Sequence, residues 1–170
     1  MRADPLFVDL RIALANAQPI GQFLSEHLAA GDAALVSLTQ AQRVLLDAGL
    51  AQMIQSIYLA SENILVKIAA TVDGGVPAKD ENWHAALLAR MANKFPGRRP
   101  AVLSPETLDI LTKLRGFRHV ARNTYAHQPD HARLLSNAAL AVSALPKLSA
   151  DIDALERCML SDPESDKPDV

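Results

Sequence analysis

Residues 40–71, QAQRVLLDAGLAQMIQSIYLASENILVKIAAT, are the longest stretch of the chain with a regular apolar pattern. Apolar residues recur along it at steps of three and four, which is the spacing of one face of an α-helix. A second apolar line runs beside the first through Ile54, Leu65 and Val72. Because a helix with two apolar sides packs against neighbours on both, we expect the central helix of a bundle. The first line consists of Leu46, Leu50, Met53, Ile57, Ile64, Ile68 and Thr71.

Start and stop signals delimit the other helices. Residues 73–77 (Asp-Gly-Gly-Val-Pro) end the central helix, because glycine suits the left-handed C-cap and proline prevents the helix from continuing. Residues 104–106 (Ser-Pro-Glu) open a later helix with a serine N-cap, a proline at the first position and an acid in the first turn. Asp130, after Pro129, caps the last helix. The expected helices span residues 5–30, 40–71, 80–93, 105 into the Arg/His stretch described below, and 131–160 with a kink at Pro146. Pro19 and Gly21 interrupt the first of these, so we expect a kink or two shorter helices there.

The composition places the chain in the all-α class. Of its 170 residues, 49% are hydrophobic but only 4% are aromatic, and Ala and Leu dominate. This favours helices packed by aliphatic side chains over a β-sandwich, which uses Val, Ile, Tyr and Phe. The length fits a single domain. We expect an up-and-down helical bundle of four main helices and a short one over residues 1–160, followed by a disordered acidic tail over residues 161–170.

Several function classes find no support in the sequence. The single cysteine, Cys158, cannot form an internal disulfide, which is typical of a reducing compartment. No apolar run approaches the ~20 residues of a membrane span, and the N-terminus, with Asp4, Pro5 and Asp9, has no signal-peptide pattern. No Cys/His or carboxylate cluster has metal-ligand spacing. We therefore expect a cytoplasmic protein without membrane contact, metal or cofactor.

Positive charge is concentrated in one segment of an otherwise acidic chain. Between Lys94 and Arg133 there are eight Lys/Arg and three Asp/Glu, a net charge of +5. The remainder carries −7, which gives the net charge of −2 for the whole chain. Three of the five histidines lie in the same segment. Such segregation is what a local anion site requires.

The densest part of this segment is residues 115–127, RGFRHVARNTYAH. Read as a helix, Leu114, Phe117, Ala121 and Tyr125 share one side, and the basic residues form a strip along its edge. The strip is too basic for a core and too dense for an ordinary surface, so we interpret it as the functional site. Its members are Arg115, Arg118, His119 and Arg122.

The order of residues in this region resembles a known superfamily. Arg122 and His127, separated by four residues, resemble the R-x4-6-H motif of the HEPN superfamily of all-helical proteins. The motif alone is a weak signal, but further segments resemble the HepT-like toxins of that superfamily in the same order, over residues 45–135. These segments are Tyr58-x-x-x-Glu62, Asp73-Gly74-Gly75-x-Pro77, Trp83-His84 with Leu87-Leu88, and Leu114-Arg115-x-Phe117-Arg118-His119.

This resemblance implies a metal-independent endoribonuclease, the toxin of a toxin–antitoxin pair, which acts on RNA as a homodimer with two Arg/His pairs facing each other across the interface. It also implies an antitoxin partner, a minimal nucleotidyltransferase. In some members that partner adenylylates a tyrosine two residues after the histidine. Here Pro129 occupies that position, and Tyr125 is the nearest candidate. Relatives often lack the histidine, so His127 favours activity.

The residues themselves fit RNA cleavage without a metal, which needs a base for the 2′-hydroxyl, an acid for the 5′-oxygen and positive charge on the phosphorane. His127 is suited to proton transfer, Arg122 offers forked donors to the phosphate, and Asn123 would orient the phosphate or the imidazole. One protomer supplies only one such histidine, so a two-fold interface would supply the second. Flanking phosphates would be held by Arg118, Arg115 and His119.

The spacing of the motif carries a structural condition. Residues five apart point roughly 140° apart on an ideal helix. Arg122 and His127 therefore converge only if the helix ends near Tyr125, which Pro129 favours.

Structural interpretations of these residues stay open beside the functional one. His127 would then be an exposed loop histidine or bond the last carbonyls of its helix, and Arg122 would pair with Glu62 or Asp130. The basic strip would be a solvated helix face. Tyr58 and Tyr125 would be core residues with hydrated hydroxyls, and Trp83-His84 would serve packing.

Two other functions stay open for the whole protein. One is a non-catalytic HEPN-like module that uses the basic strip to bind a nucleotide or a nucleotidyltransferase. The other is a purely structural helical dimer, which predicts no affinity for RNA at low salt.

Overall fold

The computed structural model describes residues 4–31, 35–122 and 130–161, with the side chains of residues 119–122 excepted. Within these ranges the only β-structure is an isolated bridge between Phe95 and Arg99. This confirms the all-α class. A five-residue π-helix, η2 (Ala69–Asp73), continues the second helix. The α-helices are α1 (Pro5–Ala30), α2 (Gln40–Ile68), α3 (Trp83–Ala92), α4 (Pro105–Arg122) and α5 (His131–Ser161).

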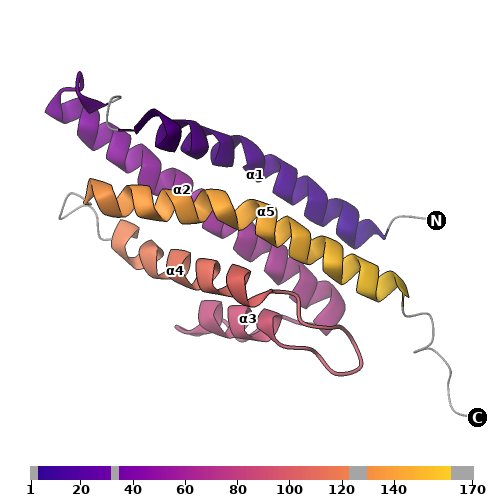
Figure 1. Cartoon of the computed structure of the whole chain (residues 1–170). Coiled ribbons are helices and arrows are strands. Elements are labelled where there is room, and N and C mark those ends of the chain that lie inside the picture. The colour runs from indigo at the N-terminus through magenta and orange to yellow at the C-terminus, as the bar shows by residue number, and fades with distance from the viewer. Residues whose placement is uncertain (1–3, 32–34, 123–129, 162–170) are drawn as a thin grey trace, which may run out of the picture.

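The helices pack as an up-and-down bundle, with α3 as the short element (Figure 1). α2 contacts α1, α3, α4 and α5, so it is the central helix that the two apolar lines predict. α1 begins and α5 ends at one end of the bundle, where Arg11 bonds Asp153 and Glu156 (Figure 1). α4 ends and α5 begins at the opposite end (Figure 1). The basic strip therefore approaches that second end of the bundle.

Aliphatic side chains form the core. Both apolar lines of α2 are represented in it, through Leu50, Ile57 and Ile68 on one side and Ile54 and Leu65 on the other. Each fully buried side chain of this size contributes about 1.5–3 kcal/mol relative to an exposed one. The largest fully buried side chains are Phe7, Leu10, Leu24, Ile54, Ile57, Ile64, Leu65, Ile68, Leu87, Met91, Leu111 and Leu114.

Of the two outcomes expected at Pro19 and Gly21, a kink or two shorter helices, the second is wrong, because α1 is one helix through Pro19. Pro19 lies on the exposed face, where water can bond the carbonyl that loses its helical partner. Gly21 is buried, and a Cβ at this position would lie 3.0 Å from Cδ1 of Leu145. Close packing of α1 against α5 thus explains the glycine. Phe23, an apolar residue of this helix, is 61% exposed.

The end of the central helix agrees with its sequence signal. After the wider turn of η2, Gly74 adopts the left-handed conformation with φ of 81°, and its backbone N–H donates to the carbonyl of Ala69. The N–H of Gly75 donates to the same carbonyl at 3.1 Å. A residue with a Cβ is strained in this conformation, so glycine is required at position 74.

The predicted caps of the last two helices are also confirmed. Ser104 accepts from the backbone N–H of Thr107 at 3.3 Å through Oγ, and its own N–H donates to Asp151 of α5 at 3.0 Å. Asp130 accepts from the N–H of Ala132 at 3.1 Å. The bond from Ser104 to Asp151 joins the start of α4 to α5. It therefore sets the direction in which α4 carries its arginines.

One segment of the described chain, Gln40–Asp73, has the length and composition of a helix that can cross a membrane. Its most apolar window has a mean hydropathy of 1.2 and is 33% buried. Polar residues such as Gln52 and Gln55 interrupt it, which is why the sequence contains no continuous apolar run of that length. The central helix of a bundle has the same composition because it is packed on several sides.

Candidate functional site

α4 carries two of the expected phosphate-binding residues into the described structure. Arg115 and Arg118 lie three residues apart on this helix, and both are partly buried. The helix is described as far as the backbone of Arg122. Arg115 and Arg118 are therefore the members of the basic strip whose surroundings are known.

The other expected site residues lie outside the described part. Asn123, Tyr125 and His127 are not described, and the side chains of His119 and Arg122 are not described either. The convergence of Arg122 and His127 near a helix end stays a prediction.

Glu62 of α2 forms the polar centre of the site. This carboxylate is only 5% exposed. The hydroxyl of Tyr58, one turn earlier, donates to Oε2 at 3.0 Å, and Nδ1 of His84 in α3 bonds the same oxygen. Nη1 of Arg118 lies 3.7 Å from Oε1. A buried carboxylate is tolerated only when it is paired and hydrogen-bonded, and here three helices supply the partners.

Tyr58 is a neutral donor in this cluster. Burial raises the pKa of Tyr58 well above its ordinary value, and the charge of Glu62 and the hydrogen bond to it act in the same direction. The positive charges of Arg118 and Arg115 oppose the shift but do not cancel it. Tyr58 is 3% exposed, so it is a core residue as expected, and its hydroxyl donates to Glu62.

The contact with Glu62 places a proton on Nδ1 of His84, because a carboxylate only accepts and Nδ1 must donate to it. Nη1 of Arg118 lies 3.0 Å from Nε2 and 3.4 Å from Nδ1 of the same ring, so the guanidinium contacts both ring nitrogens and not the Nε2 lone pair alone. The carboxylate thereby fixes the orientation of the imidazole. The Trp83 ring lies beside it, with the two ring centroids 4.0 Å apart.

Two cavities share Arg118 as part of their walls. The larger, of about 420 Å³, is also lined by Trp83, His84, Arg115 and Gly116, with the acidic residues Asp80 and Glu81 among its other lining residues. Its volume lies in the range of ligand sites. Two guanidinium groups and an aromatic ring suit a phosphate and a base, respectively. The smaller cavity, of about 100 Å³, is lined by Gln52, Gln55, Ser56, Tyr58, Leu59 and Leu114.

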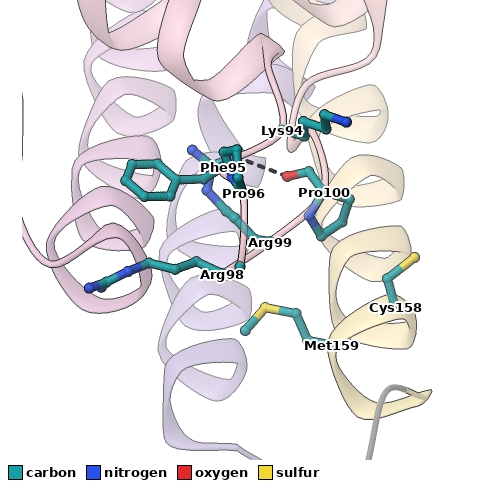
Figure 2. A pocket seen from close by; sticks show the side chains of 9 residues that line it. Lys94, Phe95, Pro96, Arg98, Arg99, Pro100, Cys158 and Met159 are labelled. Atoms are coloured by element: carbon teal, nitrogen blue, oxygen red, sulfur yellow. Dashed lines mark hydrogen bonds between the residues drawn. The ribbon is translucent and has the colours of Figure 1, made fainter. Parts of the chain in front are cut away.

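A third cavity, of about 630 Å³, lies between the basic loop 94–100 and the end of α5 (Figure 2). Lys94 and Arg98 point to opposite sides of this loop (Figure 2). Nη1 of Arg98 donates to the carbonyl of Val72 at 3.0 Å. Because these charges diverge, the loop is a poorer anion site than the cavity beside Arg118.

Arg99 holds this loop in place. Its Nε and Nη2 donate to the two carboxylate oxygens of Asp73 at 2.6 and 2.8 Å, and both side chains are 0% exposed. The remaining donors bond backbone carbonyls of Arg90, Asn93 and Pro100. Every N–H of the guanidinium is thus used within the fold, which marks a structural ion pair.

The sequence did not predict that the side chains of Glu62 and His84 bond each other. One signal was present: Glu62 lies one turn after Tyr58, among residues that the apolar lines of α2 bury. The approach of His84 from α3 and Arg118 from α4 depends on helix packing and leaves no mark in local spacing. Among the described residues, no group of three or more His, Cys, Asp and Glu is arranged to hold a metal ion.

An all-α bundle whose fourth helix carries a basic strip towards an R-x4-H sequence has the features of the HEPN class. Residues 49–159 match the family of HepT-like proteins, and this match covers more than half of the chain. The protein therefore belongs to the HepT-like family of the HEPN superfamily. The matched residues begin within α2 and end within α5, so α1 lies outside them. No curated protein and no solved structure matches the chain.

Proposed function

We propose that this protein is a metal-independent endoribonuclease, the toxin of a toxin–antitoxin pair. Its HepT-like membership carries the proposal, because the matched residues contain Arg122 at the end of α4 and His127 after it. The cavity lined by Arg115 and Arg118 supports it, since two guanidinium groups at one opening favour a polyanion.

Each residue has a chemical role in this proposal. His127 transfers a proton to or from the ribose and leaving oxygens, and Arg122 stabilises the charge of the phosphorane. Asn123 orients the phosphate or the imidazole. The phosphates on either side are held by Arg118, Arg115 and His119, which contact the backbone and confer little base preference.

The proposal includes two protein partners. A second copy of the chain would bring a second Arg122/His127 pair to a shared cleft, which suits a reaction with two proton transfers. A nucleotidyltransferase-type antitoxin would silence the toxin, and Tyr125 is the nearest candidate for its modification.

A second candidate function is a non-catalytic module that binds RNA, a nucleotide or the nucleotidyltransferase. One observation favours it: Arg118 already bonds His84 and lies near Glu62, so part of the basic strip serves the fold. Such a module would bind RNA and leave it intact.

Arg122→Ala and His127→Ala test the catalytic assignment. We expect either variant to lose cleavage of total RNA by about 100-fold or more, since each removes a charge stabiliser or a proton-transfer group. Expression of the wild-type chain without its partner should arrest growth, and neither variant should do so. Circular dichroism should show the same helix content in all three proteins. Full cleavage by either variant would contradict the assignment, and RNA binding without cleavage by the wild type would favour the second candidate.

A further inference from the structure

Trp83 is the least buried apolar residue on its face of α3. Leu87, Leu88 and Met91 of the same helix are at most 4% exposed and belong to the core. Trp83, one turn before Leu87, packs against that core but is only partly buried, and it lines the cavity of about 420 Å³. A tryptophan that only filled the end of the bundle would be buried with the others. Its ring is therefore partly accessible from the cavity.

The polar cluster holds the Trp83 ring in place. The ring centroid lies 4.0 Å from that of His84, and His84 bonds the buried carboxylate of Glu62. On the solvent side, Nζ of the exposed Lys79 lies 5.9 Å from the Trp83 centroid. An exposed contact of a cation with an aromatic ring is weaker than the stacking of a nucleobase on that ring, so a base can take the place of the lysine. α3 thus presents a fixed aromatic ring to the cavity.

The charged groups of the cavity come from two elements. α4 supplies the guanidinium groups of Arg115 and Arg118, and the segment before α3 supplies the carboxylates of Asp80 and Glu81. Among the described residues, no ion pair joins the two groups, and Arg115 has no hydrogen bond to another side chain. Arg118, in contrast, contacts the polar cluster. The cavity therefore suits a ligand that carries an anion on one part and hydrogen-bond donors on another, which is the chemistry of a nucleotide.

The acidic side of the cavity favours one base. Oδ1 of Asp80 accepts from the backbone N–H of Asn82 at 2.8 Å, which fixes the orientation of this carboxylate. Carboxylates only accept hydrogen bonds. Guanine presents two adjacent donors, N1–H and the 2-amino group, on its Watson–Crick edge. Adenine and cytosine place an acceptor nitrogen beside their amino group, and uracil places its N–H between two carbonyls. Guanine is therefore the base that matches the carboxylates of Asp80 and Glu81.

We propose that this cavity binds one unpaired guanine nucleotide of the RNA substrate; this rests on the proposed ribonuclease function. The base stacks on Trp83, its Watson–Crick edge bonds Asp80 and Glu81, and its phosphate is held by Arg115. A base in this position is neither paired nor stacked in a duplex, so the site selects single-stranded RNA. The volume of about 420 Å³ is near the lower end of ligand sites, which suits a single nucleotide. The contacts to the base add a sequence preference that phosphate contacts do not provide.

The single tryptophan of the chain gives a direct test, because all tryptophan fluorescence comes from Trp83. The wild-type protein is titrated at low salt with the 5′-monophosphates of guanosine, adenosine, cytidine and uridine, which it cannot cleave. Free N-acetyltryptophanamide corrects for absorbance and collisional quenching. We expect saturable quenching by all four, with guanosine monophosphate bound about tenfold more tightly than the others. No saturable quenching, or equal affinity for the four nucleotides, would overturn the proposal.

Three variants assign the contacts, with affinities for the same nucleotides measured by calorimetry. The double substitution Asp80→Asn with Glu81→Gln retains the shape of both side chains and the acceptor for Asn82, and should abolish the preference for guanine. Arg115→Ala should weaken all four nucleotides by a similar factor. Trp83→Leu should weaken them by about tenfold or more, and Trp83→Phe, which retains an aromatic ring, should weaken them less. A preference for guanine that survives the double substitution would overturn the role of the two acids.

Asp109→Asn is the matched control, because it removes an exposed acid of α4 that pairs with Lys113 and does not line the cavity. It should bind every nucleotide as the wild type does. The outcome also separates this inference from the proposed function. A chain that cleaves RNA but whose Trp83 fluorescence does not respond to nucleotides overturns this inference alone. A chain that binds guanosine monophosphate as expected but cleaves no RNA overturns the ribonuclease function and leaves the nucleotide site standing.

Discussion

At the scale of single residues, Glu62 decides how the site is organised. A carboxylate in the packed face of a central helix needs donors, and Tyr58, His84 and Arg118 approach it from three helices. The site and the packing of α2, α3 and α4 are therefore coupled through one side chain. Substitutions at Glu62 act on both, which is why a test of function requires a variant that retains its shape.

The hydroxyl of Tyr58 gives a direct spectroscopic test of this cluster. The chain has two tyrosines, so Tyr125→Phe leaves Tyr58 as the single reporter. Because burial and Glu62 raise the pKa of Tyr58, we expect no tyrosinate absorbance near pH 10, where an exposed tyrosine ionises. The signal should appear only when the protein unfolds in alkali. A reversible titration of the folded variant with an ordinary tyrosine midpoint would contradict the burial of the hydroxyl beside Glu62.

The raised pKa of Tyr58 also determines how the free energy of unfolding changes with pH. Below the ordinary tyrosine pKa, Tyr58 is protonated in both the folded and the unfolded chain. Above it, the unfolded chain releases the proton first, so the free energy of unfolding should fall as the pH rises. Tyr58→Phe should remove this part of the alkaline loss, as measured by urea unfolding at a series of pH values; an unchanged alkaline slope in Tyr58→Phe would contradict it.

At the scale of elements, the end of the central helix is joined to the basic loop by the Asp73–Arg99 pair. Asp73→Asn leaves a buried guanidinium without its counter-charge, and should lower the free energy of unfolding by about 3–5 kcal/mol in urea. Asp109→Asn is the matched control, because the pair of Asp109 with Lys113 is exposed and should contribute less than about 0.5 kcal/mol. Equal effects of the two substitutions would contradict a structural role for Arg99.

Most elements were predictable because their signals are local. The periodicity of residues 40–71, the glycine at 74 and the cap at Ser104 each specify backbone geometry through neighbouring residues. Sequence alone left a kink or a division at Pro19 open because the outcome depends on tertiary position: on an exposed face a proline can be accommodated within one helix packed along α5. The Glu62–His84 contact was not predictable for the same reason, since it joins α2 to α3.

At the scale of the whole molecule, the separation of charge and the proposed function together predict salt-dependent binding of RNA. With an inactive His127→Ala protein, affinity for a single-stranded RNA should fall as salt rises. Arg115→Ala should reduce the slope of log affinity against log salt by about 0.7, the value for one lost phosphate contact. Arg11→Ala, which removes a cation of α1 that bonds Asp153 and Glu156, should leave the slope unchanged. The measurement is fluorescence anisotropy over a potassium chloride series, and equal slopes in the two arginine variants would contradict an RNA path along α4.

The family assignment connects these scales, because the matched residues include the central helix from residue 49 onward, the polar cluster and the R-x4-H sequence. The central claim is that this chain breaks RNA by attack of the 2′-hydroxyl without a metal ion. The most direct measurement is incubation of purified protein with a defined RNA in excess chelator, followed by analysis of the new ends. We predict 2′,3′-cyclic phosphate and 5′-hydroxyl ends with the wild type and none with His127→Ala. Intact RNA with the wild type, or identical cleavage by His127→Ala, would contradict the claim.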